Sequence, residues 1–176
     1  MKTLALILVV LAVAGAIGYL LLDKRPGYGA WYGIARLTGS RLDIGRVDWV
    51  TLTRHPTPND ALICPPGVCP QATSDAEARV YDITPAELLA RIKRAALAEP
   101  HTRELACDPD CDRVARILQL TPLMRYPDTV DIEVFPAGNG ATLAIYSRSL
   151  VGGGDFGVNR KRIARWLKAL DAPEPG

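Results

Sequence analysis

The sequence lacks the motifs that most enzymes use for catalysis. It has two histidines in 176 residues, and neither stands near a plausible nucleophile, so a Ser-His-Asp triad is not indicated. There is no GxSxG element, no P-loop, no HExxH motif and no dinucleotide-binding fingerprint. We therefore expect a non-catalytic protein with no catalytic residues, no cofactor and no bound metal.

The sequence also lacks a large excess of either positive or negative charge. The chain carries 21 basic and 19 acidic side chains, for a formal net charge of +2, which gives no reason to expect a nucleic-acid partner. Apolar residues make up 48% and charged residues 23% of the chain, and this composition excludes a disordered protein. About 150 residues follow the apolar amino terminus, which is the usual size of one domain.

The amino terminus is a long apolar run. Residues 3–22 carry no charge and are bounded by Lys2 and Asp23. As a helix, residues 4–22 span about 28 Å, close to the hydrocarbon thickness of about 30 Å. The rival is a cleaved signal peptide with a cleavage site near Ala14, but apolar residues continue beyond it. We expect a bilayer anchor over residues 1–25, a juxtamembrane segment over 26–46 and a periplasmic domain over 47–172.

The four cysteines fall into two close pairs, Cys64 with Cys69 and Cys107 with Cys111. An even number of cysteines behind an export-like segment indicates two disulfides in an oxidising compartment. Three pairings can be drawn, and we favour the two local ones because proline and Gly67 turn the short loops back. The rival is a four-thiolate zinc site, which requires a cytosolic domain.

The rest of the chain mixes short strand patterns with two amphipathic helices. Alternating or apolar stretches predict strands over 41–52, 79–83, 114–120, 130–135 and 141–149, and the last two form a hairpin. Residues 55–74 are predicted to be a long loop. Helices are predicted from a Thr84 cap to Leu97 and from an Asn159 cap to Leu170. The expected fold is α+β: an amino-terminal transmembrane helix, then a mostly antiparallel sheet of about four or five strands with two amphipathic helices on one face.

The start of the second helix has an unusual charge distribution. Arg160, Lys161 and Arg162 occupy its first turn, where the helix dipole disfavours each cation by about 0.3–1 kcal/mol. The compensating anion is either internal, from Asp128, Asp131 or Asp155, or an external phosphate or carboxylate held by the glycine-rich loop. The predicted anion-binding or ligand-binding residues are Arg148, Ser149, Gly152, Asp155, Asn159, Arg160 and Arg162.

Residues 145–152 and 155–163 together resemble the closing signature of the bacterial family known as domain of unknown function 1499. Residues 126–128 resemble its FPD element, and Pro58 and Asn59 resemble its early PN element. The resemblance extends over about residues 47–170. The chain departs from the pattern at Gly154, where serine is common, and in its cysteines. The resemblance implies an architecture and an envelope location but no reaction. We expect a single-pass inner-membrane protein with a periplasmic carboxy-terminal domain.

Three functional hypotheses follow. The leading one is an anchored domain that binds an anionic small ligand or an envelope protein through the glycine-rich loop, with residues 4–22 in the lipid bilayer. The second is an accessory subunit of a membrane protein complex, docked through its transmembrane helix. The third is a hydrolase-like enzyme with a site around Arg148, Asp155 and Arg160, which requires these three side chains to meet in one pocket.

Overall fold

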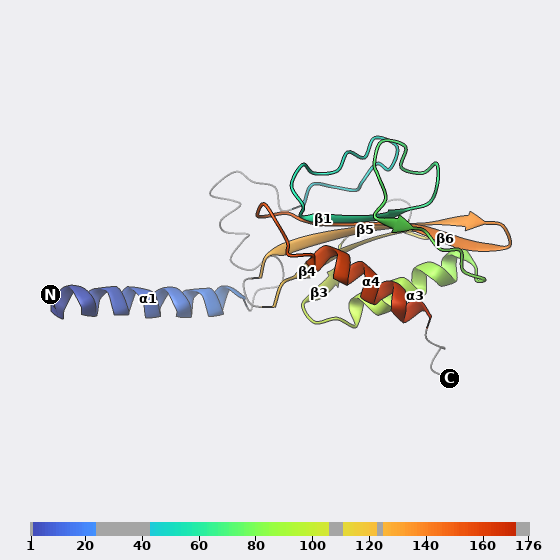
Figure 1. The fold of residues 1–176 in the computed structure, drawn as a ribbon. Coiled ribbons are helices and arrows are strands. Elements are labelled where there is room, and N and C mark those ends of the chain that lie inside the picture. Colours follow the sequence, from blue (N-terminus) through green and yellow to red (C-terminus); the bar gives the residue numbers. More distant parts are fainter. Residues whose placement is uncertain (1, 24–42, 106–110, 123–124, 172–176) are drawn as a thin grey trace. The chain divides into compact units, whose positions relative to one another are not determined.

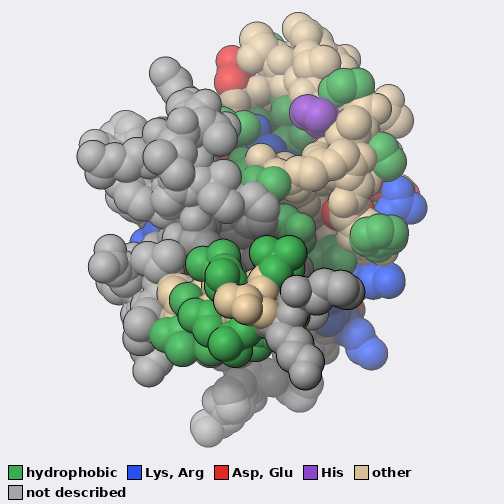
Figure 2. All heavy atoms as spheres, turned by 90° about the vertical axis from the view of Figure 1, so that its left-hand side faces the viewer, with side chains coloured by type: hydrophobic (Ala, Val, Ile, Leu, Met, Phe, Trp, Pro, Cys, Tyr) green, Lys and Arg blue, Asp and Glu red, His purple; other side chains and the backbone are tan. Residues whose placement is uncertain are grey.

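The computed structural model describes residues 2–23, 43–105, 111–122 and 125–171. The chain divides into two compact units, residues 1–42 and residues 43–176, and the second is called the domain below. The first unit holds helix α1, Lys2–Asp23, whose exposed side chains include Leu4, Leu8 and Leu11. Figure 2 shows that apolar side chains gather on this helix. Among the residues described, no helix combines the length and the apolar character that a bilayer crossing requires. The anchor therefore stays a prediction from the sequence.

The domain is built on one six-stranded mixed sheet with the order β2-β1-β6-β5-β4-β3. All neighbouring strands are antiparallel except β1 and β2. Helices α3 and α4 lie on one face of the sheet, and the segments on either side of β1 lie on the other (Figure 1). This confirms the α+β class, but the sheet has six strands rather than four or five. The strands are β1 Asp60–Cys64, β2 Ala76–Glu77, β3 Thr102–Glu104, β4 Val114–Leu120, β5 Pro127–Ala137 and β6 Gly140–Ser149.

Both predicted amphipathic helices are present. Helix α3 spans Pro85–Leu97, and the Thr84 hydroxyl accepts the Glu87 N–H at 3.2 Å, as expected of an N-cap residue. Helix α4 spans Val158–Leu170, and its N-cap is Gly157 rather than Asn159. The buried faces of both helices pack on β4, β5 and β6 to form the main core. Buried residues of α3 and α4 are Leu88, Leu89, Ile92, Ala96, Asn159, Arg162, Ile163, Trp166 and Leu170.

The predicted hairpin is confirmed as β5 and β6, which are longer than expected and pair from Asp128 with Ser149 to Ala137 with Gly140. Two strand predictions are wrong. The described part of 41–52 has no strand; Val47, Trp49 and Leu52 are buried against the sheet without pairing in it. Residues 79–83 contribute a single bridge from Tyr81 to Ala141. The predicted loop 55–74 contains β1, which pairs with β6.

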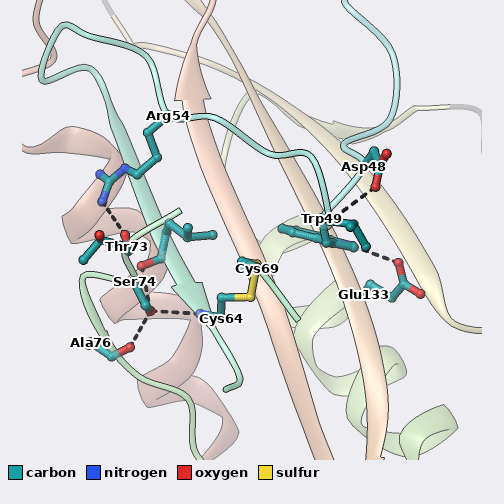
Figure 3. The surroundings of a disulfide bond; sticks show 11 residues. Asp48, Trp49, Arg54, Cys64, Cys69, Thr73, Ser74, Ala76 and Glu133 are labelled. Carbon is teal, nitrogen blue, oxygen red and sulfur yellow. Dashed lines mark hydrogen bonds between the residues drawn. A yellow bond between two sulfur atoms is a disulfide. The ribbon is translucent and has the colours of Figure 1, made fainter. Parts of the chain in front are cut away.

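A second, smaller core covers the face of the sheet away from the helices. Trp49 packs there near the Cys64–Cys69 disulfide (Figure 3), so the first predicted pairing is confirmed and a four-thiolate zinc site is wrong. Cys111 is a free, exposed cysteine. Cys107 lies outside the described residues, and the second predicted disulfide is not shown. The buried residues of this core are Val47, Trp49, Leu52, Leu62, Cys64, Cys69, Ala144 and Tyr146.

Candidate functional site

The predicted ligand-binding residues surround the loop that joins β6 to α4. Because side chains alternate along a strand, β5 and β6 direct polar groups to both faces of the sheet. Asp128 and Ser147 share the helix-covered face with the core residues Val130 and Ile145, whereas Arg148 lies on the opposite face. The first turns of α4 pack over the helix-covered side and bring Arg162 into a buried polar cluster.

Arg162 is the centre of this cluster and only 1% of its side chain is exposed. Its Nη2 lies 2.6 Å from Oδ2 of Asp128. Its Nη1 donates to Oγ of Ser147 at 2.8 Å and to Oδ1 of Asn159 at 2.5 Å, and its Nε donates to Oε1 of Gln119. Burial raises the pKa of the Asp128 carboxyl, and the charge of Arg162 opposes that rise. Arg162 is therefore bound internally rather than presented to a ligand.

Asn159 connects α4 to the loop and to the start of β1. Its Nδ2 donates to the carbonyl of Asn59 at 2.9 Å and to Oγ of Ser149 at 3.0 Å. The Asn59 side chain in turn donates from Nδ2 to the carbonyl of Gly152 at 2.9 Å. Both asparagines are buried. Two of these bonds join residues 93 and 100 positions apart in the chain, and together they fix the first half of the loop.

Asp155 fixes the second half of the loop. Its carboxylate accepts the backbone N–H groups of Gly157 at 2.9 Å and Asn159 at 2.8 Å. Gly157 has a φ of 76°, in the left-handed region that glycine adopts at little cost. A carboxylate at this end of α4 offsets the positive end of the helix dipole. It also occupies two of the N–H groups that an external anion would use.

Arg148 is paired on the other face of the sheet. Its Nη2 lies 3.3 Å from Oδ2 of Asp131 and donates to the carbonyl of Gly45 at 3.2 Å. Arg116 also contacts Asp131, at 3.2 Å. Burial raises the pKa of the Asp131 carboxyl, and both arginines oppose the rise. For Arg148 and Arg162, the compensating anions are thus the internal carboxylates Asp131 and Asp128.

The remaining predicted cation lies on the outside. Arg160 has 72% of its side chain exposed and meets Asp75 at 3.3 Å. Its neighbour Lys161 is exposed as well, as are Gly152, Gly153 and Gly154 of the loop.

Phe156, which the sequence analysis did not select, is 97% exposed with a φ of 52°. The sequence feature that could have indicated Phe156 is an aromatic residue placed between a glycine-rich stretch and the start of a helix.

Two cavities lie elsewhere on the domain. One of about 580 Å³ is lined by residues that include Arg46, Trp49, Val68, Glu133 and Phe135. Glu133 is buried there and accepts Nε1–H of Trp49 at 2.8 Å (Figure 3). The other, of about 430 Å³, lies beside the disulfide.

The predicted enzyme residues line neither of these two cavities. Arg148 is bound to Asp131, Asp155 to the backbone of α4, and Arg160 to Asp75. The three side chains are therefore committed to three separate partners rather than to one shared centre. In the ranges that the structure describes, no group of three or more histidine, cysteine, aspartate or glutamate side chains could hold a metal ion.

Comparison with known proteins identifies the family. Residues 57–170 match the profile of a family described as a protein of unknown function, DUF1499, and the chain belongs to this family. No curated protein matches the sequence. Among solved structures, the crystal structure of protein CV1439 from Chromobacterium violaceum is similar, with 15% identity and a TM-score of 0.30 over 65% of this chain and 94% of that one.

Proposed function

We propose that this chain is a membrane-anchored, non-catalytic protein of the bacterial envelope. Its binding surface would be the binding loop, defined as residues 150–157, together with Arg160 and Lys161, and it would bind an anionic partner. The observation that carries this proposal is the separation of the cations into two groups. Arg148 and Arg162 are neutralised inside the domain. Arg160 has 72% of its side chain exposed and meets Asp75 at 3.3 Å, but that carboxylate also pairs with Arg54 at 2.9 Å. Arg160 and Lys161 therefore face outward beside the loop.

The rigidity of the binding loop supports a role in recognition. Asn59 holds the carbonyl of Gly152, and Asp155 holds two N–H groups at the start of α4. A loop that is fixed before binding loses less conformational freedom when a partner arrives. Since Asp155 already occupies the start of the helix, the geometry favours an anion that lies across Arg160 and Lys161 over one enclosed by the backbone.

The location of the protein is supported by two features. The uncharged run of residues 3–22 predicts an anchor. The Cys64–Cys69 disulfide is typical of a compartment outside the reducing cytosol. A single-pass protein with its carboxy-terminal domain in the periplasm accounts for both features.

The test is a titration of the full chain in detergent micelles with inorganic phosphate, followed by backbone amide shifts. We expect saturable shifts confined to residues 150–161. The variant Arg160→Gln/Lys161→Gln should lose them. The matched control is Arg165→Gln/Lys168→Gln, which removes the same charge from the second half of α4 and should keep the shifts. Shifts that are absent, or equal in both variants, would contradict the proposal.

A further inference from the structure

Phe156 stands out among the apolar residues of the domain. It is 97% exposed, compared with 63% for Val80 and 60% for Val50. Its φ of 52° lies in the left-handed region, which is unfavourable for a residue with a bulky side chain. Packing within the domain gives no reason for an aromatic ring at this position, because the ring contributes almost nothing to the core.

The surroundings of Phe156 hold the ring outward. Asp155, directly before it, bonds to the N–H of Gly157, directly after it, at 2.9 Å. The carbonyl of Asp155 also accepts the N–H of Val158 at 3.0 Å. The backbone around Phe156 is thus closed into a tight turn that maintains the strained conformation. Gly153 and Gly154 are exposed beside it and carry no side chains that could shield the ring.

The most exposed charges near the ring are those of two cations. Arg160 and Lys161 are exposed within five positions of Phe156, while the carboxylate of Asp155 is bound to backbone N–H groups. The carboxylate of Asp75, which meets Arg160 at 3.3 Å, is shared with Arg54 at 2.9 Å. An aromatic ring with cations beside it fits the interface of an anionic bilayer, where rings occupy the headgroup layer and lysine or arginine meets lipid phosphate.

A lipid surface is a better partner for Phe156 and the glycines beside it than a protein groove is. A stable protein interface buries about 800 Å² on each partner, and one phenylalanine flanked by glycines offers far less apolar area. A tethered domain needs only a weak contact, because the tether makes binding effectively intramolecular.

The first residues of the domain contact the strand that leads into the binding loop. The carbonyl of Gly45 accepts Nη2–H of Arg148 at 3.2 Å, and the loop begins two residues after Arg148.

We propose that Phe156 inserts into the headgroup layer of an anionic bilayer, with Arg160 and Lys161 on the lipid phosphates. This inference rests on the proposed function and specifies its partner. The contact would hold the domain against the membrane that carries its anchor, in one orientation.

The test uses the two phenylalanines of the chain. The full chain, labelled with fluorophenylalanine, gives two fluorine resonances in bicelles, and the variant Phe156→Gly assigns them. Phe135 is the internal control. It pairs with Thr142, seven strand positions along β5 from the Asp128–Ser149 pair beside the loop. At the usual rise per residue, these two pairs are about 23 Å apart. Spectra are recorded in phosphatidylcholine bicelles with and without phosphatidylglycerol, with a spin-labelled lipid or with a water-soluble paramagnetic chelate.

In bicelles that contain phosphatidylglycerol, we expect the spin-labelled lipid to broaden the Phe156 resonance and the chelate to leave it sharp. The Phe135 resonance should not be broadened by the lipid label. In Arg160→Gln/Lys161→Gln, the chelate rather than the spin-labelled lipid should broaden the Phe156 resonance. Lys168→Gln should behave like the unmodified chain. Phe156→Gly should melt no lower than the unmodified chain, because glycine tolerates a φ of 52°.

The outcomes separate this inference from the proposed function. A Phe156 ring that stays accessible to the chelate on both kinds of bicelle overturns the lipid contact. If the phosphate titration still gives shifts over residues 150–161, the anion-binding proposal survives that result. A chain that does not co-purify with the bicelles overturns the anchor and the lipid contact together.

Discussion

The buried ion pair between Arg162 and Asp128 allows the sharpest test of the fold. Replacing Arg162 with methionine keeps most of the side-chain volume but removes the positive charge. It leaves the carboxylate of Asp128, now 2.6 Å from the guanidinium, buried without its counter-charge. It also removes the donor that Ser147 and Asn159 share. Breaking a buried pair from one side costs about 3–5 kcal/mol, a large part of the 5–15 kcal/mol that stabilises a typical domain.

Two further variants show whether the charge causes this loss. Arg162→Met/Asp128→Leu removes both charges, and we expect it to regain most of the stability, since an apolar pair can replace a buried ion pair at little cost. Arg165→Met is the control on the same helix. It breaks the contact with Glu99 at 2.9 Å, but 54% of the Arg165 side chain is exposed, so we expect a loss below about 1 kcal/mol.

The measurement is a urea titration of the full chain, followed by circular dichroism and by tryptophan fluorescence, to which Trp166, 1% exposed, contributes. The free energy of unfolding is compared among the variants at equal m values. The reasoning is refuted if Arg162→Met costs no more than Arg165→Met. It is also refuted if removing both charges is as harmful as removing one.

Three other predictions concern the rest of the domain. Cys64→Ser/Cys69→Ser should lower the free energy of unfolding by about 2 kcal/mol, since the closed loop has a sequence separation of 5. In the unmodified chain, mass spectrometry should find Cys64 and Cys69 alkylated only after a reductant is added. Gly140→Ala should lower the melting temperature clearly, because its Cβ would lie 2.0 Å from the carbonyl oxygen of Tyr81. Burial raises the pKa of Asp75, but hydrogen bonds, above all from Arg54, lower it overall below 3.8. The ionised Asp75 therefore stabilises the fold above that pH, and this contribution is lost as the pH falls below it. In urea titrations at different pH, Asp75→Asn should reduce the loss of unfolding free energy at acid pH.

The elements that the sequence predicts well are those specified by local signals. The capping residue Thr84 and the apolar positions of α3 lie within one short segment, and the structure has the helix where these signals place it. The β5–β6 hairpin is likewise specified by alternation on both sides of one turn. Strand β1 is different. Its five residues lie among prolines, and its partner Arg148 is 88 positions beyond Asp60, so only the folded sheet shows that it is a strand.

The candidate site divides in the same way. The sequence indicates that the cations at the start of α4 need compensating anions, and it includes Asp128, Asp131 and Asp155 among the candidates. It does not show which cation is buried. The helical period contains that signal, since Arg162 follows Asn159 by three positions and precedes Trp166 by four, and all three are buried on the same side of α4. Net charge and spacing alone treat Arg160 and Arg162 as equivalent.

The contacts around the binding loop separate two roles within the family signature. The side chains of Asn159 and Arg162 are bound to other groups of the domain, and so is the carboxylate of Asp155. Their polar atoms maintain the loop and cannot at the same time hold a ligand without loss of these bonds. The exposed chemistry belongs instead to Phe156 and Arg160. Substitutions in the first group should therefore lower stability and binding together, whereas substitutions in the second should change binding and leave the fold intact.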